Sequence, residues 1–258
     1  MMAGALGGSE LALLLAGAVI AGFVQGLSGF GFSMVAMTVW VWGLSPQLAA
    51  VMGVFGSLTG QVVGAFAVRR SLAWGTLAPF VAGGLVGMPI GVWLLPRLDA
   101  TLFKLMLGTL LVVCCPAMLW SRRLPRVGPH GAGSSHWGDS LAGAAGGLMG
   151  GLGGFTGVVP TLWCTLRGFA KADQRSVVQN FNLATLAATM AAYVASGAVT
   201  RPMWPLLPLV AASIVLPSLL GARVYRGLGE TGFRRLVLGL LTAAGALMLA
   251  TALPRVLR

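Results

Sequence analysis

The chain has 258 residues, of which 57% are hydrophobic and only 9% are charged, and it carries a formal net charge of +12. Soluble domains average about 25% charged residues, so this composition excludes a soluble domain with a polar exterior. The basic residues stand singly or in pairs between apolar runs, which is typical of membrane helix ends and argues against a nucleic-acid partner.

We therefore expect an all-α polytopic membrane protein, with room for about eight crossings at roughly 20 residues each. Arg69 is the first basic residue, so the beginning of the chain lacks the positive region of a cleaved secretory signal. We expect the first apolar segment to remain in the mature protein.

Residues 1–120 are predicted to form a first transmembrane repeat. Its apolar segment 11–43 would be about 50 Å long as one helix, too long for one straight crossing of a roughly 30 Å hydrocarbon core. The Gly-rich stretch 26–31 lies in the middle of that segment. We predict a helical hairpin broken at these glycines, which either re-enters the membrane or crosses it twice. Three spans follow, at about 47–68, 76–96 and 101–120.

Residues 121–138 form a polar linker, and residues 139–258 are predicted to repeat the plan of the first half. Gly26-Leu27-x-Gly29-Phe30 recurs as Gly151-Leu152-x-Gly154-Phe155, at an offset of 125 residues. Further spans are expected at about 174–196, 203–223 and 233–253. The sequence thus predicts two homologous halves, each a Gly-broken helical hairpin plus three transmembrane helices.

An odd number of crossings in each half would make the halves inverted repeats, a common plan in secondary transporters. The hairpin arrangement places twelve basic residues on one side of the membrane and five on the other. Treating each Gly-rich segment as one plain span would divide them eight against nine. The positive-inside rule favours the hairpins, with the central linker in the cytoplasm and both ends of the chain outside.

The Gly-rich breaks are the first candidate site. A break at membrane depth is tolerated only where it is buried in protein or lines a cavity, and the N-terminal N–H groups of broken helices favour an anion. The alternative is close helix packing through small residues. The candidate substrate-binding residues of the breaks are Gly26, Ser28, Gly29, Gly31, Gly151, Gly153, Gly154, Thr156 and Gly157.

The segment 174–196 supplies the second candidate group. Arg175, Gln179 and Asn182 fall on one helical face, and polar residues inside a span usually face the bundle or a water-filled path. Arg175 has an alternative role as an anchor of the helix end at the interface. Gln25 and Gln61 are the comparable amides of the first half, with interhelical hydrogen bonds as the alternative.

The sequence offers little to support catalysis. There is no P-loop, and every carboxylate falls at a predicted helix end or in a loop. An intramembrane enzyme would need a catalytic pair at membrane depth, so we expect neither an enzyme nor a cofactor or metal site. Cys114, Cys115 and Cys164 are expected to be free thiols packed in helices.

The Gly-rich openings of both halves, together with Leu166-Arg167-Gly168, Lys171, Arg175 and the stretch 179–182, resemble the TauE/SafE-type sulfite exporter family over nearly the whole chain. The resemblance implies a secondary transporter in the cell inner membrane that exports sulfite, a sulfonate or a related organosulfur anion.

Two departures from the family pattern leave the substrate open. Phe30 and Phe32 interrupt the glycine run, and Pro160 stands alone where related sequences often have several prolines. The expected partners are a small anion and the lipid bilayer, and assembly with further copies of the chain stays open. The competing interpretation is a membrane-embedded accessory or assembly protein that moves nothing itself.

Overall fold

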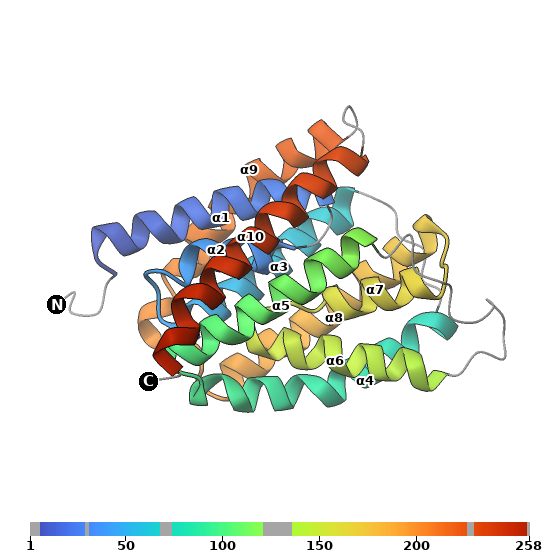
Figure 1. Cartoon of the computed structure of the whole chain (residues 1–258), viewed down its shortest axis with the longest axis horizontal. Coiled ribbons are helices and arrows are strands. Elements are labelled where there is room, and N and C mark those ends of the chain that lie inside the picture. The colour runs from blue at the N-terminus through green and yellow to red at the C-terminus, as the bar shows by residue number, and fades with distance from the viewer. Residues whose placement is uncertain (1–5, 29–30, 68–73, 121–135, 226–229, 257–258) are drawn as a thin grey trace.

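The computed structural model describes residues 6–28, 31–67, 74–120, 136–225 and 230–256, and the regular structure within these ranges is entirely helical (Figure 1). By length and composition, five of the described helices can cross a membrane: Gly8–Leu27, Pro46–Ala65, Trp74–Arg97, Ala100–Trp120 and Arg201–Val224. The prediction of an all-α, multi-pass membrane protein is confirmed. In the last helix, the described residues contain only a shorter apolar stretch, Leu241–Pro254.

The helices follow the predicted order in both halves. The first half contains α1 (Gly8–Ser28), α2 (Phe32–Trp40), α3 (Pro46–Ala67), α4 (Trp74–Leu94), the short η1 (Leu95–Arg97) and α5 (Ala100–Trp120). The second half contains α6 (His136–Gly153), α7 (Val158–Leu166), α8 (Lys171–Ala195), the short η3 (Arg201–Met203), α9 (Leu206–Tyr225) and α10 (Glu230–Val256).

Each hairpin has one long arm and one short arm. The long arms α1 and α6 have 21 and 18 residues, whereas the short arms α2 and α7 have 9 each. Nine helical residues rise only about 13 Å, well short of a roughly 30 Å hydrocarbon core. Of the two forms the sequence left open, a re-entrant short arm fits these lengths better than a second full crossing.

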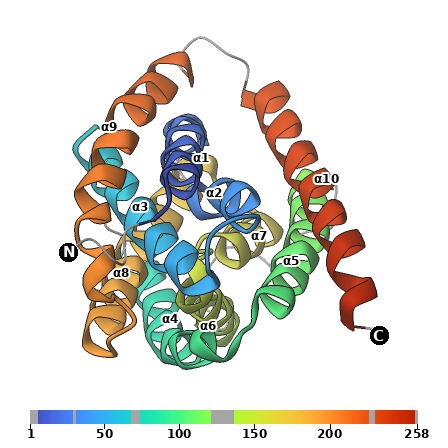
Figure 2. The same ribbon diagram turned by 90° about the vertical axis from the view of Figure 1, so that its left-hand side faces the viewer.

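The two hairpins point into the bundle from opposite ends. In Figure 1, α1 begins at the end of the bundle where α10 finishes, and α6 begins at the other end, where α5 finishes. Viewed along the bundle, the short arms α2 and α7 both lie near its middle (Figure 2).

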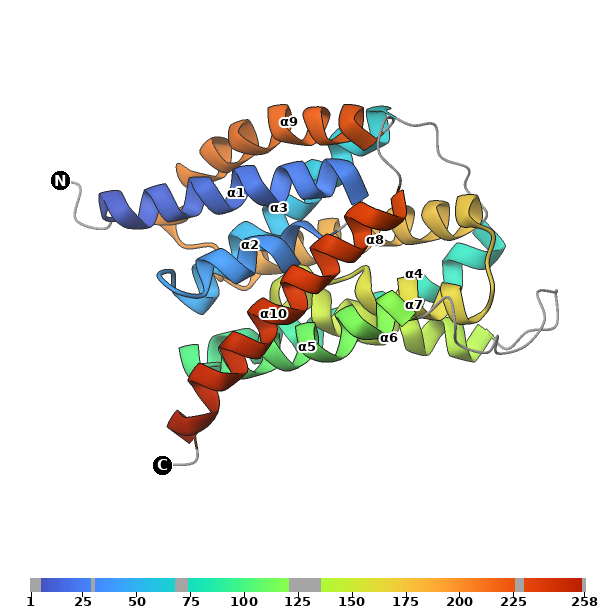
Figure 3. The same cartoon turned by 45° about the horizontal axis from the view of Figure 1, so that its top comes forward.

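Helix packing pairs one half with the other. The long arm α1 packs on α9, the long arm α6 packs on α4, and α5 packs on α10, as the tilted view shows for α1 with α9 (Figure 3). In chain order, α1 to α5 of the first half correspond to α6 to α10 of the second. The α1–α9 contact then corresponds to the α6–α4 contact, and the α3–α8 and α5–α10 contacts each join two corresponding helices. These helix contacts are therefore the same when the two halves are exchanged.

Glycines allow the long arms to touch their partner helices backbone to backbone. A Cβ added at Gly26 of α1 would lie 2.0 Å from the carbonyl oxygen of Ser218, and one added at Gly83 of α4 would lie 1.9 Å from that of Ser140. Such contact is the usual role of small residues where membrane helices pack.

A buried tryptophan fixes the first hairpin. Trp40, fully buried at the end of α2, donates a hydrogen bond from Nε1 to the Leu14 carbonyl of α1 at 3.1 Å. Its indole occupies the space left by Gly17, where a Cβ would lie 2.2 Å from Nε1. The indole therefore holds the two arms together near the open end of the hairpin, and the break at the other end faces the second half.

Candidate functional site

The two Gly-rich breaks line one pocket. The pocket is lined by Gln25, Gly31, Met34, Ser57, Gln61, Gly154, Phe155, Thr156, Gly157, Val158, Asn182 and Leu186. None of these residues carries a formal charge. The lining combines segments more than a hundred residues apart in the sequence, and both halves contribute to it.

The second break is built by a helix-terminating turn. Gly154 has φ of 84°, its N–H donates to the Gly150 carbonyl at 2.8 Å, and the Phe155 N–H reaches back to the Met149 carbonyl at 3.3 Å. The bond from the Gly154 N–H to the Gly150 carbonyl is the αL pattern, in which a left-handed glycine ends a helix. A Cβ at Gly154 would also lie 2.5 Å from Ser33 Oγ. Both backbone conformation and space therefore require glycine there.

The short arms begin at the pocket. α2 starts directly after Gly31, whose φ is 94°, and α7 starts directly after Gly157. Neither position has a side chain that caps the first turn. The first N–H groups of a helix have no partner within it, and its N-terminus behaves like roughly half a positive charge. Two such ends at one uncharged pocket favour an anion there.

Two amides line the pocket with acceptor oxygens that lack partners. Gln25 and Asn182 are only 3% and 2% exposed, and no hydrogen bond to the described residues reaches Gln25 Oε1 or Asn182 Oδ1. Buried polar atoms are nearly always hydrogen-bonded, so two unpaired oxygens at one pocket indicate a site for a polar ligand or water.

Hydrogen bonds connect α1 to α2 and α3 beside Gln25. Gln25 Nε2 donates to the Ser57 carbonyl at 3.1 Å, and the Ser57 and Ser33 hydroxyls lie 2.8 Å apart. Ser33 Oγ also donates to the Gly53 carbonyl at 2.9 Å. These bonds join α1, α2 and α3 at the pocket, since Gln25 and Ser57 are lining residues.

The offset of 125 residues between the two Gly-rich motifs also relates pocket-lining positions of α3 and α8. At the same offset of 125 residues, Ser57 corresponds to Asn182 and Gln61 to Leu186. Positions related by this offset therefore line the pocket from α3 and α8, but their chemistry differs.

The candidate residues of the sequence analysis have different positions. Gly31, Gly154, Thr156, Gly157 and Asn182 line the pocket. The others among the described residues do not: Gly26 and Gly151 pack on neighbouring helices, Gly153 packs against Phe155 and Met37, Gln179 is buried elsewhere in α8, and Arg175 is exposed. Gly29 and the side chain of Ser28 lie outside the described residues.

Sequence reasoning missed part of the lining. Met34, Ser57, Phe155, Val158 and Leu186 were not singled out, and Gln25 and Gln61 were noted only as comparable amides. Ser57 and Gln61 are four residues apart in α3, so they share one face of the helix. That spacing was the sequence signal from which these two lining residues could have been predicted.

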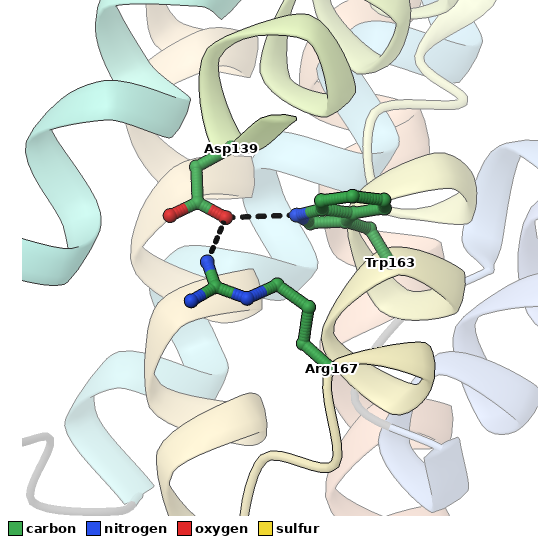
Figure 4. Close-up of polar contacts among 3 residues, drawn as sticks. All are labelled: Asp139, Trp163 and Arg167. Atoms are coloured by element: carbon green, nitrogen blue, oxygen red, sulfur yellow. Dashed lines mark hydrogen bonds and ion pairs between the residues drawn. The ribbon is translucent and has the colours of Figure 1, made fainter. Parts of the chain in front are cut away.

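A buried ion pair lies outside the pocket, in the second hairpin (Figure 4). Arg167 Nη1 pairs with Asp139 Oδ1, and Trp163 Nε1 donates to the same oxygen at 2.7 Å. The Arg167 and Asp139 side chains are 8% and 4% exposed. From the sequence alone, Asp139 is predicted at a helix end or in a loop, and Arg167 among the twelve basic residues on one side of the membrane. Their pairing joins the start of α6 to the end of α7.

A bundle of apolar helices with an uncharged polar pocket between two broken hairpins defines a multi-pass membrane protein with the features of a transporter. The family model for the sulfite exporter TauE/SafE matches residues 14–248, and the chain belongs to this family. It is accordingly a membrane transporter and not an enzyme. Searches among curated proteins and among solved structures found no match.

Proposed function

We propose that the chain is a secondary transporter that exports a small sulfur-containing anion, either sulfite, a sulfonate or a related organosulfur compound. The observation that carries the proposal is the pocket between the two breaks, with the N-termini of α2 and α7 beside it. Membership of the TauE/SafE family agrees with this chemistry.

Binding would use groups from both halves. The N–H groups of the first turns of α2 and α7 would hold the anionic oxygens, with Gly31, Gly154 and Gly157 allowing close approach. Thr156 and Asn182 would add polar contacts from the second half. We place Ser28 and Gly29 at the same break by sequence alone.

We further infer that residues 1–120 and 139–258 are inverted repeats joined by the linker 121–138. The opposite directions of the two hairpins and the interchangeable helix pairs support this arrangement. In transporters with inverted repeats, the site lies between the repeats near the middle of the membrane. Movement of one repeat against the other would expose the pocket to each side in turn.

Flux into liposomes tests the proposal. Purified protein should take up labelled sulfite or at least one of thiosulfate, taurine and sulfoacetate faster than protein-free liposomes do. Gly154→Leu is the matched control, because its side chain would fill the break. Should well-folded protein move none of these sulfur compounds, the accessory or assembly role becomes the better interpretation.

Direction is tested in oriented vesicles. Inverted and right-side-out membrane vesicles that contain the chain should differ in sulfite accumulation when an inside-negative or inside-positive potential is imposed. Export requires faster movement from the cytoplasmic face at the physiological sign of the potential.

A further inference from the structure

We propose that the pocket selects a singly charged sulfur anion that carries its own hydrogen-bond donor, such as hydrogensulfite or a small hydroxysulfonate. Acceptor-only anions, such as sulfate and the sulfite dianion, would bind poorly. This inference rests on the proposed function and specifies the substrate class of the same site.

The charge around the pocket matches one negative charge. None of the described lining residues is cationic, so the attraction comes from the N-termini of α2 and α7. Each helix end is equivalent to roughly half a positive charge, and two sum to about one. A dianion would leave about one further negative charge unbalanced in a low-dielectric site, where a bare charge is strongly disfavoured.

Gln25 presents an acceptor whose orientation is fixed. Only the amide nitrogen can donate to a carbonyl, so the 3.1 Å bond to the Ser57 carbonyl identifies that atom as Nε2. The other amide atom must be the oxygen, and it has no donor among the described residues. A ligand that brings an O–H or N–H group can supply the missing bond.

The serine pair adds a second acceptor. The Ser33 hydroxyl donates its only proton to the Gly53 carbonyl, so in the 2.8 Å contact Ser57 is the donor and Ser33 accepts. Ser57 has then used its own proton, and its Oγ can only accept from the pocket. Asn182 Oδ1 is also unpaired there.

Donors and acceptors are therefore separated around the pocket. Helix N–H groups face the negative oxygens, while Gln25 Oε1 and Ser57 Oγ require a proton from the ligand. An acceptor-only anion has no proton to donate, so Gln25 Oε1 and Ser57 Oγ would stay unpaired and would face the oxygens of the anion. Sites built to hydrogen-bond a substrate group discriminate strongly against analogues that lack the group, because buried partners are left unsatisfied.

A matched pair of inhibitors tests the inference on the wild-type protein. 2-Hydroxyethanesulfonate and propane-1-sulfonate carry the same charge and the same number of heavy atoms, but only the first has a hydroxyl donor. Competition against labelled sulfite uptake in liposomes at constant pH should show at least tenfold stronger inhibition by the hydroxyl compound, or about 1.4 kcal/mol. Sulfate should inhibit less than either. Equal inhibition by the two sulfonates, including none by both, would overturn the inference.

Gln25→Met identifies the group responsible. Methionine keeps the length of the side chain but removes the acceptor, so the preference for the hydroxyl compound should fall severalfold. Gln47→Met is the control, because Gln47 lies on α3 outside the pocket lining and bonds the Ala198 carbonyl. An unchanged preference in Gln25→Met contradicts the assignment, and if that variant does not insert, the wild-type competition decides.

The two proposals fail in different ways. Absence of any sulfite or sulfonate flux in the wild type refutes the proposed function. Sulfite flux without discrimination between the two sulfonates refutes only the donor requirement.

Discussion

Two glycines with left-handed backbone begin or end the helices at the pocket, and their surroundings differ. Gly154 combines φ of 84° with a crowded Cβ position, where Ser33 Oγ would be 2.5 Å away and Val54 Cα 3.2 Å. Gly31 has φ of 94°, but a Cβ there would meet nothing within 4 Å. The first position is restricted by both strain and space, and the second by strain alone.

We therefore expect Gly154→Ala to destabilise the protein more than Gly31→Ala. The left-handed conformation costs a non-glycine residue roughly 1–2 kcal/mol, and the clash at Gly154 adds to it. Thermal unfolding of the two variants in detergent, with sulfite flux in liposomes, measures the difference. Equal losses in both variants would show that the contact with Ser33 is easily relieved.

A negative charge at the pocket should abolish anion transport. Thr156 is buried and lines the pocket, so the carboxylate of Thr156→Asp would repel an anion in a low-dielectric site. Arg175→Gln is the contrast, since Arg175 is exposed and outside the lining, and we expect its apparent affinity to stay within about twofold. Initial uptake rates at several sulfite concentrations test both. Normal transport by Thr156→Asp would show that the anion takes another route.

The sequence identified the site residues whose role follows from local backbone chemistry. Gly31, Gly154 and Gly157 stand in Gly-rich runs that interrupt apolar segments, and Asn182 is a polar residue inside a span. It could not separate them from Gly26 and Gly151, because glycine serves helix packing and helix breaks equally well. Ser57 escaped notice because a single serine in an apolar helix usually bonds its own backbone.

At the scale of the helices, the buried ion pair of the second hairpin sets a clear expectation. Removing one partner of a buried pair leaves an uncompensated charge, which costs about 3–5 kcal/mol. Arg167→Met should therefore lower the melting temperature strongly. The double variant Asp139→Asn with Arg167→Met should recover part of the loss, because Asn keeps an acceptor for Trp163.

A double-mutant cycle on thermal unfolding checks this coupling. Additive losses in the two single variants and the double variant would mean that Asp139 and Arg167 do not stabilise the hairpin through each other. Sulfite flux in the same samples shows whether the pair also matters for movement.

The contact between α4 and α6 predicts a second effect at this scale. A Cβ at Gly147 would lie 2.1 Å from the Gly84 carbonyl oxygen, so Gly147→Ala must push the two helices apart. Gly75→Ala, near the start of α4, is the matched control because nothing lies within 4 Å of its Cβ position. We expect a clear drop in melting temperature for the first variant only, and similar values for both would contradict the close packing.

Helix order and the positions of the breaks followed from the apolar periodicity and the glycines. The lengths of the hairpin arms did not, since the apolar segment 11–43 continues past the end of α2 without a polar residue to mark it. The Asp139–Arg167 ion pair could not be predicted from the sequence either. Charges near helix ends usually reach water, and only the packed hairpin brings these two together.

At the scale of the whole molecule, the inverted arrangement predicts the sides of the membrane. Ser9 and His136 are exposed at the first turns of α1 and α6, which begin at opposite ends of the bundle. In a variant without the three native cysteines, Ser9→Cys should be labelled by an impermeant thiol reagent only from outside, and His136→Cys only from the cytoplasm. Labelling of both from one side would refute the inverted repeats.

The pairing of the halves was only partly predictable from the sequence. The repeated Gly-Leu-x-Gly-Phe motif indicated two equivalent units, and their packing follows that equivalence. Which helix of one half packs on which helix of the other depends on the small surfaces around Gly26, Gly83 and Gly147. In the sequence, these three glycines cannot be distinguished from the other glycines of the chain.

The uncharged lining of the pocket has an electrical consequence for the proposed exporter. The helix dipoles belong to the protein and do not travel with the anion. Each hydrogensulfite ion released outside would therefore carry one full negative charge across the bilayer. An inside-negative potential of 100 mV favours that movement by about 2.3 kcal/mol, enough for a roughly 50-fold concentration ratio at equilibrium. A cell could then clear the anion using its resting voltage alone, with no counter-ion to bind.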